Sequence, residues 1–210
     1  MFPLNNPLPK KRRTRTRGKV RVEQLLDAAC DLLAEHELTE LTFKDVYERA
    51  QIPPGSAYHF FDSIEALCLS LIDRFQYELM DAVSGEAEPG KISTWMDMVD
   101  LILDRVIVFY NSNAAARRIL TQPGLHIGTI FEADKRSGVR LEEILDRYFV
   151  LPEIRQRREI FILATKIAHL LISISVTQYG KITEEMGAEL KAAVKGYLKN
   201  YVPEMLTRRS

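Results

Sequence analysis

The feature that most constrains this chain is a helical apolar pattern that is interrupted again and again by turn residues. Between Arg21 and Glu37, apolar residues recur at steps of three and four, namely Val22, Leu25, Leu26, Ala29, Leu32 and Leu33. This spacing places them along one face of an amphipathic helix. Similar segments follow to the end of the chain, and none alternates apolar and polar residues as a half-buried strand does. The sequence therefore predicts an all-α protein.

Capping and stop residues set the expected helix ends. Thr42 suits an N-cap, with Asp45 as an imperfect capping box, and Pro54 suits the first position of a helix. Gly180 suits a helix end. We expect helices over residues 21–37, 43–50, 54–60, 64–83, 93–110, 113–122, 138–149, 152–179 and 184–201. For residues 125–137 the pattern does not decide between one short helix and two.

Composition divides the chain into three expected parts. Residues 1–18 are rich in proline and basic residues and end at Gly18, which predicts a flexible arm. A Gly/Pro/acid segment, residues 85–90, is the expected boundary between a head at 19–84, which includes a linking helix, and a body at 85–210.

The net charge is zero, but its distribution is uneven. Residues 1–21 hold eight of the 29 basic residues and no acid, so the remainder has 21 basic and 29 acidic residues, a net charge of −8. Positive charge concentrated in an arm favours a polyanionic partner, and a solubilising or nuclear-import-like tail is the alternative.

Other classes of protein find little support. The apolar stretch 160–176 is shorter than the roughly 20 residues of a membrane span, and we expect it to be buried between protein surfaces. Cys30 and Cys68 lie in helical patterns, which fits small buried hydrophobes in a reducing, cytoplasmic setting. Scattered histidines and a broken phosphate-loop pattern at 85–92 predict no metal, no cofactor and no enzymatic activity.

The segment from Thr42 to Phe61 predicts a helix-turn-helix. Its apolar positions can share one small core, namely Val46, Ala50, Ile52, Ala57 and Phe61. Ser56 and His59 face outward, Tyr58 flanks them, and Gly55 allows close approach of the backbone. Such a helix fits the DNA major groove, which is about 12 Å wide.

Residues 25–72 resemble the DNA-binding head of the TetR (tetracycline-repressor-like) family. The matching positions are Leu26-Asp27-Ala28-Ala29, Leu33-Ala34-Glu35, Leu41-Thr42, Val46, Ala50, Gly55, Tyr58, Phe61, Ser63, Glu65 and Leu67. The resemblance implies a sequence-specific transcriptional regulator that binds a palindromic operator in double-stranded DNA as a homodimer. It further implies a repressor that a small-molecule effector releases from DNA.

The resemblance also implies roles for individual residues. The expected DNA-binding residues in the head are Thr42, Lys44, Pro54, Gly55, Ser56, Tyr58 and His59. Thr42 is alternatively a plain cap, and Tyr58 is alternatively in part a packing residue. Two positions depart from the family, which commonly has Tyr or His in place of Phe60 and Lys in place of Ile64. Both usual residues resemble anchors to the DNA backbone, so we expect two phosphate contacts of the family to be missing here.

The acidity of the head gives the arm a specific expected role. Residues 22–78 contain three basic and twelve acidic residues. We therefore expect the basic arm to supply much of the affinity for DNA, with Arg15 or Arg17 entering an adjacent minor groove.

The body is expected to pair and to sense a ligand. Helices 153–178 and 184–201 predict a dimer face, and the family implies an effector pocket. The candidate ligand-binding residues are Trp95, Met98, Val99, Ile102, Phe109, Arg118, His126, Phe131, Tyr148 and His169. Each has ordinary core packing as its alternative, and together they suggest an apolar or aromatic effector that tilts helix 64–83. An architectural DNA-binding dimer without ligand, and a helical enzyme or protein-binding module, remain as other readings.

Overall fold

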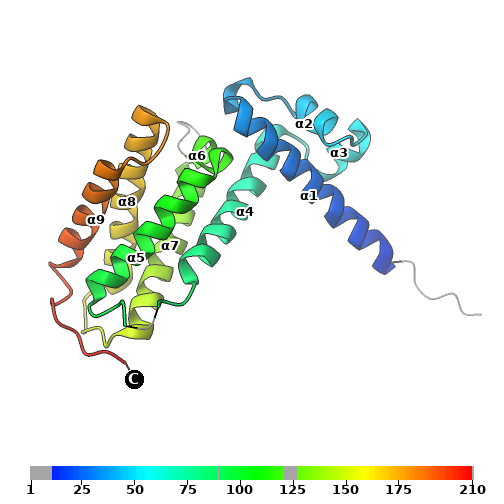
Figure 1. The fold of residues 1–210 in the computed structure, drawn as a ribbon. Helices are drawn as coiled ribbons and strands as arrows, with labels where there is room; N and C mark the ends of the chain where they lie inside the picture. The colour runs from blue at the N-terminus through cyan, green and yellow to red at the C-terminus, as the bar shows by residue number, and fades with distance from the viewer. Residues whose placement is uncertain (1–10, 89, 121–126, 210) are drawn as a thin grey trace, which may run out of the picture. The chain divides into compact units, whose positions relative to one another are not determined.

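The computed structural model describes residues 11–88, 90–120 and 127–209, with side chains described in 18–88, 90–119 and 132–209. Within these ranges the regular structure is helical, apart from one isolated bridge between Phe149 and Arg208 (Figure 1). The expected all-α fold is confirmed. The helices are α1 (Lys11–Glu35), a 3₁₀ turn η1 (Leu38–Glu40), α2 (Phe43–Arg49), α3 (Pro54–Phe60), α4 (Ile64–Ser84), α5 (Trp95–Ser112), α6 (Ala114–Leu120), α7 (Ile127–Tyr148), α8 (Arg157–Tyr179) and α9 (Glu184–Leu198).

The chain forms two compact units, residues 1–71 and 72–210. We call them the head and the body. The division falls within α4, between Leu71 and Ile72, whereas the sequence placed it after residue 84. Helix α4 therefore begins in the head and ends in the body.

The head has a small core to which each of its helices contributes. Fully buried side chains come from α1 (Leu25 and Leu33), α2 (Val46), α3 (Ala57) and α4 (Leu67). A buried leucine or valine contributes about 1.5–3 kcal/mol to stability. The two cysteines are free thiols, and burial raises the pKa of Cys68 to about 11. The core therefore fixes α2 and α3 against α1 without a covalent link.

Helix α1 begins at Lys11, ten residues before the expected start at residue 21. Residues 11–18 are thus helical where a flexible arm was expected. Lysine and arginine are good helix formers, and one glycine inside a helix costs only about 1 kcal/mol relative to alanine. Gly18 also lies against α3, since a Cβ at this residue would lie 3.6 Å from Cε1 of Phe60. Residues 1–10 of the expected arm lie outside the described residues.

The body is a bundle in which α7 packs on α8, α8 on α9, and α9 on α5 (Figure 1). Helices α7 and α8 approach closely at Gly138, where a Cβ would lie 2.6 Å from Cα of Ile162. Residues 125–137 were expected to form one or two short helices before a separate helix starting at Gly138, but α7 is continuous from Ile127 to Tyr148. Glycine here serves a close helix crossing and does not end a helix.

The ends of α8 and α9 show where local signals succeed and fail. Gly180 ends α8 with a left-handed φ of 70°, as expected. The start of α8 was expected at Pro152, but it follows Gln156, whose φ of 56° is also left-handed. The preceding segment is held by the C-terminal residues, with the Val150 amide donating to the Thr207 carbonyl at 2.8 Å. Helix α9 ends at Leu198, three residues before its expected end at residue 201.

Candidate nucleic-acid interface

The start of α2 is fixed by a complete capping box. Oγ1 of Thr42 accepts from the Asp45 amide at 3.3 Å, and the Asp45 carboxylate accepts from the Thr42 amide at 3.0 Å. The Thr42 hydroxyl also donates to this carboxylate, at 2.5 Å. These hydrogen bonds from Thr42, side chain first, lower the pKa of Asp45. The predicted cap is confirmed, and the hydroxyl of Thr42 is engaged by it.

A tight turn then directs α3 across α2. Gln51 takes a left-handed φ of 55°, and Ile52 is buried in the turn. Pro53 precedes the helix, and Pro54 occupies its first turn, as the sequence predicted. The turn therefore fixes which side of α3 meets the core.

Helix α3 has one buried side and one open side. Ala57 and the following Phe61 are buried, whereas Pro54, Gly55 and His59 are exposed. A Cβ at Gly55 would meet no heavy atom within 4 Å, so the space in front of this residue is open. The open side is short, and the imidazole of His59 is exposed on it.

Tyr58 belongs to an aromatic cluster that joins α2 and α3. Its ring centroid lies 5.1 Å from that of Phe43 and 6.3 Å from that of Tyr47. Tyr58 is nevertheless 54% exposed. It is thus both a packing residue and a surface residue, and it places Thr42 and Lys44, the neighbours of Phe43, beside α3. Tyr47 was not among the expected residues, although its spacing of four from Phe43 could have indicated it.

Arg21 is a second residue that sequence reasoning missed. Its Nη1 donates to Oγ of Ser56 at 3.0 Å. This bond joins an exposed residue of α1 to the half-buried third residue of α3. A guanidinium carries more donors than this one bond uses. Arg21 therefore adds a positive charge beside the open side of α3. No local pattern indicates this pairing, because it depends on how α1 crosses α3.

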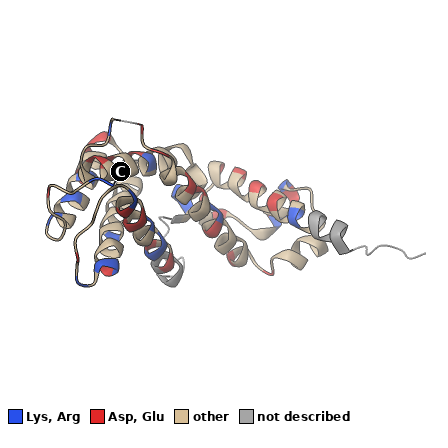
Figure 2. Ribbon diagram, turned by 90° about the horizontal axis from the view of Figure 1, so that it is seen from below, with Lys and Arg blue, Asp and Glu red and all other residues tan. Residues whose placement is uncertain are grey.

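From residue 22 to the end of the head at residue 71, the basic residues are Lys44 and Arg49. Lys44 lies 3.8 Å from Glu48, and Arg49 lies 3.2 Å from Glu35. Figure 2 shows acidic and basic positions interspersed along the helices. Arg15 and Arg17 lie on the helical backbone of α1, and their side chains lie outside the described residues.

Comparison with known families identifies this arrangement. The family described as bacterial regulatory proteins, tetR family, matches residues 25–71. The tetracyclin repressor-like C-terminal domain matches residues 94–198, about half of the chain. The chain belongs to the TetR family.

Solved TetR-family structures share this fold at low sequence identity. A regulator from Streptomyces coelicolor is 22% identical, with a TM-score of 0.68, covering 86% of this chain and 99% of that one. A regulator from Rhodococcus sp. RHA1 is 18% identical, with a TM-score of 0.64, covering 87% and 97%. The flavonoid-responsive regulator FrrA is 20% identical, with a TM-score of 0.56, covering 89% and 100%. The comparison with curated proteins found no match.

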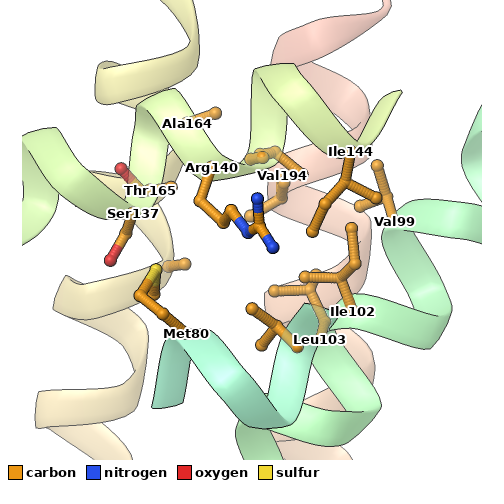
Figure 3. A pocket seen from close by; sticks show the side chains of 13 residues that line it. Met80, Val99, Ile102, Leu103, Ser137, Arg140, Ile144, Ala164, Thr165 and Val194 are labelled. Carbon is orange, nitrogen blue, oxygen red and sulfur yellow. The ribbon is translucent and has the colours of Figure 1, made fainter. Parts of the chain in front are cut away.

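The TetR-type body contains an apolar cavity of about 50 Å³ between α4, α5, α7, α8 and α9 (Figure 3). Two expected ligand-binding residues, Val99 and Ile102, line it. Its described lining is Met80, Val83, Val99, Ile102, Leu103, Ser137, Arg140, Leu141, Ile144, Ala164, Thr165, Ala168 and Val194. Sequence reasoning missed Met80 and Arg140, because nothing in their local pattern separates them from ordinary helix residues.

The other expected ligand-binding residues lie elsewhere in the body. Trp95 and Met98 are core residues, and Nε1 of Trp95 donates to the Pro203 carbonyl at 2.8 Å. Phe109 packs edge-on to Tyr110 at 5.5 Å. Nδ1 of His169 lies 3.1 Å from the buried carboxylate of Asp134. Arg118 and Tyr148 are half-buried outside the cavity lining, and the side chains of His126 and Phe131 lie outside the described residues.

The described residues of this TetR-family chain form no cluster of potential metal ligands. Among residues 11–88, 90–120 and 127–209, no group of three His, Cys, Asp or Glu residues could hold a metal ion.

Proposed function

We propose that this chain is a homodimeric repressor that reads a palindromic operator with α3 and leaves it when a small apolar molecule occupies the body. The observation that carries the proposal is the open side of α3, where Gly55 and His59 face solvent beside a rigidly capped α2. TetR-family regulators bind operator DNA as dimers and typically respond to a small-molecule effector.

The side chains of α3 suit direct reading of bases. Histidine and tyrosine offer hydrogen-bonding groups to base edges or phosphates, and an unobstructed glycine lets the backbone approach. Ser56 is held by Arg21, which orients both groups toward the same part of the surface. In this proposal Tyr58, His59, Gly55, Pro54 and Ser56 meet DNA, and Thr42 contributes mainly by fixing α2.

Basic residues of α1 supply the affinity that the acidic segment from residue 22 to residue 78 lacks. An α-helix is about 10–12 Å across, whereas the minor groove is about 6 Å wide. A helical segment carrying Arg15 and Arg17 therefore favours contacts with phosphates over entry into the minor groove. This changes the expected contact but keeps the expected role of the basic segment.

Helix α8 supports the dimer. It is long and apolar enough to cross a membrane by length and composition, yet 33% of its apolar window is buried within the chain. Leu163, Leu170 and Ile174 share one helical face and are 48%, 61% and 37% exposed. A second copy of the chain would cover this face, since exposed apolar patches of this kind mark protein interfaces.

Ligand gating rests on α4, which takes part in both units. A ligand that enlarges the body cavity displaces Met80 or Val83 and so tilts the body part of α4. Because a two-fold dimer must hold its two recognition helices about 34 Å apart, a small tilt weakens binding to both half-sites.

Selection of bound duplexes from a random library at low ionic strength tests the DNA-binding role. We expect one palindromic sequence to be enriched, and His59→Ala to weaken binding to it by about 1–3 kcal/mol. His36→Ala, which changes an exposed histidine of the head outside α3, should leave binding unchanged. A lack of preference for any duplex sequence would overturn the proposal.

A further inference from the structure

The cavity of the body has an uneven chemical character. Most of its lining is aliphatic, yet Arg140 of α7 is also part of it, the one charged residue in that lining. Figure 3 shows the guanidinium of Arg140 directed into the space between Met80, Leu103 and Ile144. A cation among aliphatic side chains is unfavourable unless an anion or a hydrogen-bond acceptor faces it.

The contacts of Arg140 satisfy only part of this requirement. Nε and Nη2 donate to Oγ of Ser84, at 2.8 and 2.5 Å, and Nη1 donates to Glu143 at 3.1 Å. Glu143 is the counter-charge, and its side chain is 56% exposed, whereas that of Arg140 is 27% exposed. An exposed ion pair of this kind contributes little, so a better-placed anion can replace Glu143.

Arg140 and Met80 also line a second hollow. This outer groove is bounded by Glu132, Lys135, Arg136, Val139 and Glu143, together with Met80 and Arg140. The two shared residues form the wall between the charged groove and the apolar cavity. Methionine is unbranched and flexible, and Met80 is half-buried, so its side chain can move aside to admit a ligand.

We infer that this wall is the binding site for an apolar monocarboxylic acid, an inference that rests on the ligand-gated function proposed above. The carboxylate takes the place of Glu143 on Nη1 of Arg140, and the hydrocarbon tail displaces Met80 and enters the cavity. A cavity of about 50 Å³ is smaller than the roughly 150 Å³ that holds benzene, so the ligand must enlarge it. A cationic ligand is repelled by Arg140, and a neutral one gives the guanidinium no better partner than Glu143.

Calorimetric titration of the full chain with octanoate, octanol and octylamine tests the site. We expect octanoate to bind about tenfold more tightly than octanol, because a hydrogen bond between two opposite charges is stronger than one to a neutral hydroxyl. Octylamine should not bind. Arg140→Met should remove the preference for octanoate over octanol. Arg147→Met, a matched change at an exposed residue of α7 outside the lining of both hollows, should keep it.

Glu143→Gln separates a ligand site from a structural ion pair. If Glu143 competes with the ligand, its loss should tighten octanoate binding by about two- to fivefold, the range of an exposed pair. Equal binding of octanol and octanoate, or weaker octanoate binding by Glu143→Gln, would overturn the inference even if Arg140→Met fails to fold. Retained binding of the selected duplex by Glu143→Gln would show that the proposed function stands when this inference fails, whereas absence of duplex binding by the unmodified chain would sink the function itself.

Discussion

Asp97 shows how a single residue can set a helix end in a pH-dependent way. Its carboxylate accepts from the amides of Thr94 at 2.7 Å and Ser93 at 3.0 Å, at the start of α5. These bonds, that from the Thr94 amide first, lower the pKa of Asp97. Because the folded pKa lies below the unfolded value of about 3.9, the stabilisation is present above that value and is lost as pH falls through the folded pKa.

We therefore expect Asp97→Asn to lower the free energy of unfolding at pH 7 by about 1 kcal/mol or less, the usual size of a cap. The difference from the unmodified chain should shrink below about pH 4, as the carboxylate of the unmodified chain begins to protonate. Urea unfolding at pH 7 and pH 3.5 measures both quantities. Asp81→Asn, on an exposed position of α4, is the matched control, and a loss that is the same at both pH values would contradict the assignment.

Residue-level signals were sound where the chemistry is local. The Thr42 cap, Pro54 at the start of α3 and Gly180 at the end of α8 follow from backbone geometry that neighbouring residues dictate. The Arg21–Ser56 bond joins residues that are 35 positions apart, and Arg140 lines a cavity whose walls come from five helices. No local pattern encodes such pairings, so these residues escaped prediction.

At the scale of helices, the errors in the predicted helix boundaries arise mainly at glycines. Gly18 and Gly138 were taken as helix boundaries, but both lie inside helices and face a neighbouring element, Phe60 and Ile162 respectively. The sequence alone does not distinguish a glycine that ends a helix from one that permits two helices to cross closely. Helix positions with clear amphipathic spacing, such as α3 and α4, were predicted to within a residue.

The helical start of α1 leads to a prediction about salt. Deletion of residues 1–17 removes six of the eight basic residues of segment 1–21. Each phosphate contact adds about 0.9 to the slope of log K against log salt concentration. We expect the deletion to flatten this slope by several units, as measured by fluorescence anisotropy with the selected duplex.

A variant with neutral side chains in this segment separates the effect of charge from that of helix length in the same experiment. Glutamine at positions 11, 12, 13, 15 and 17 keeps good helix formers and removes five positive charges. It should flatten the slope nearly as much as the deletion. A slope that stays unchanged in both proteins would exclude the basic segment of α1 as a source of affinity.

At the scale of the whole molecule, the sequence indicated the roles of the head and the body better than it indicated how their helices are arranged. The resemblance of residues 25–72 to one family pointed to the head, and the family comparison supports it over residues 25–71. The body diverges in sequence, and its match over residues 94–198 became visible only through comparison with the family's C-terminal domain. Its fold is retained because helix packing tolerates many apolar side chains of similar volume.

The proposed dimer gives the most direct test at this scale. A charge at Leu170, which is 61% exposed on the apolar face of α8, would be buried without a partner if two copies meet there. We expect Leu170→Glu to convert the dimer to a folded monomer in sedimentation velocity at micromolar concentration, and to lose the palindrome while keeping its helical content. Val108→Glu, which alters a 65% exposed residue of α5, should remain dimeric. If Leu170→Glu sediments as a dimer, α8 does not form the interface, and the exposed face of Leu163, Leu170 and Ile174 must serve a different contact.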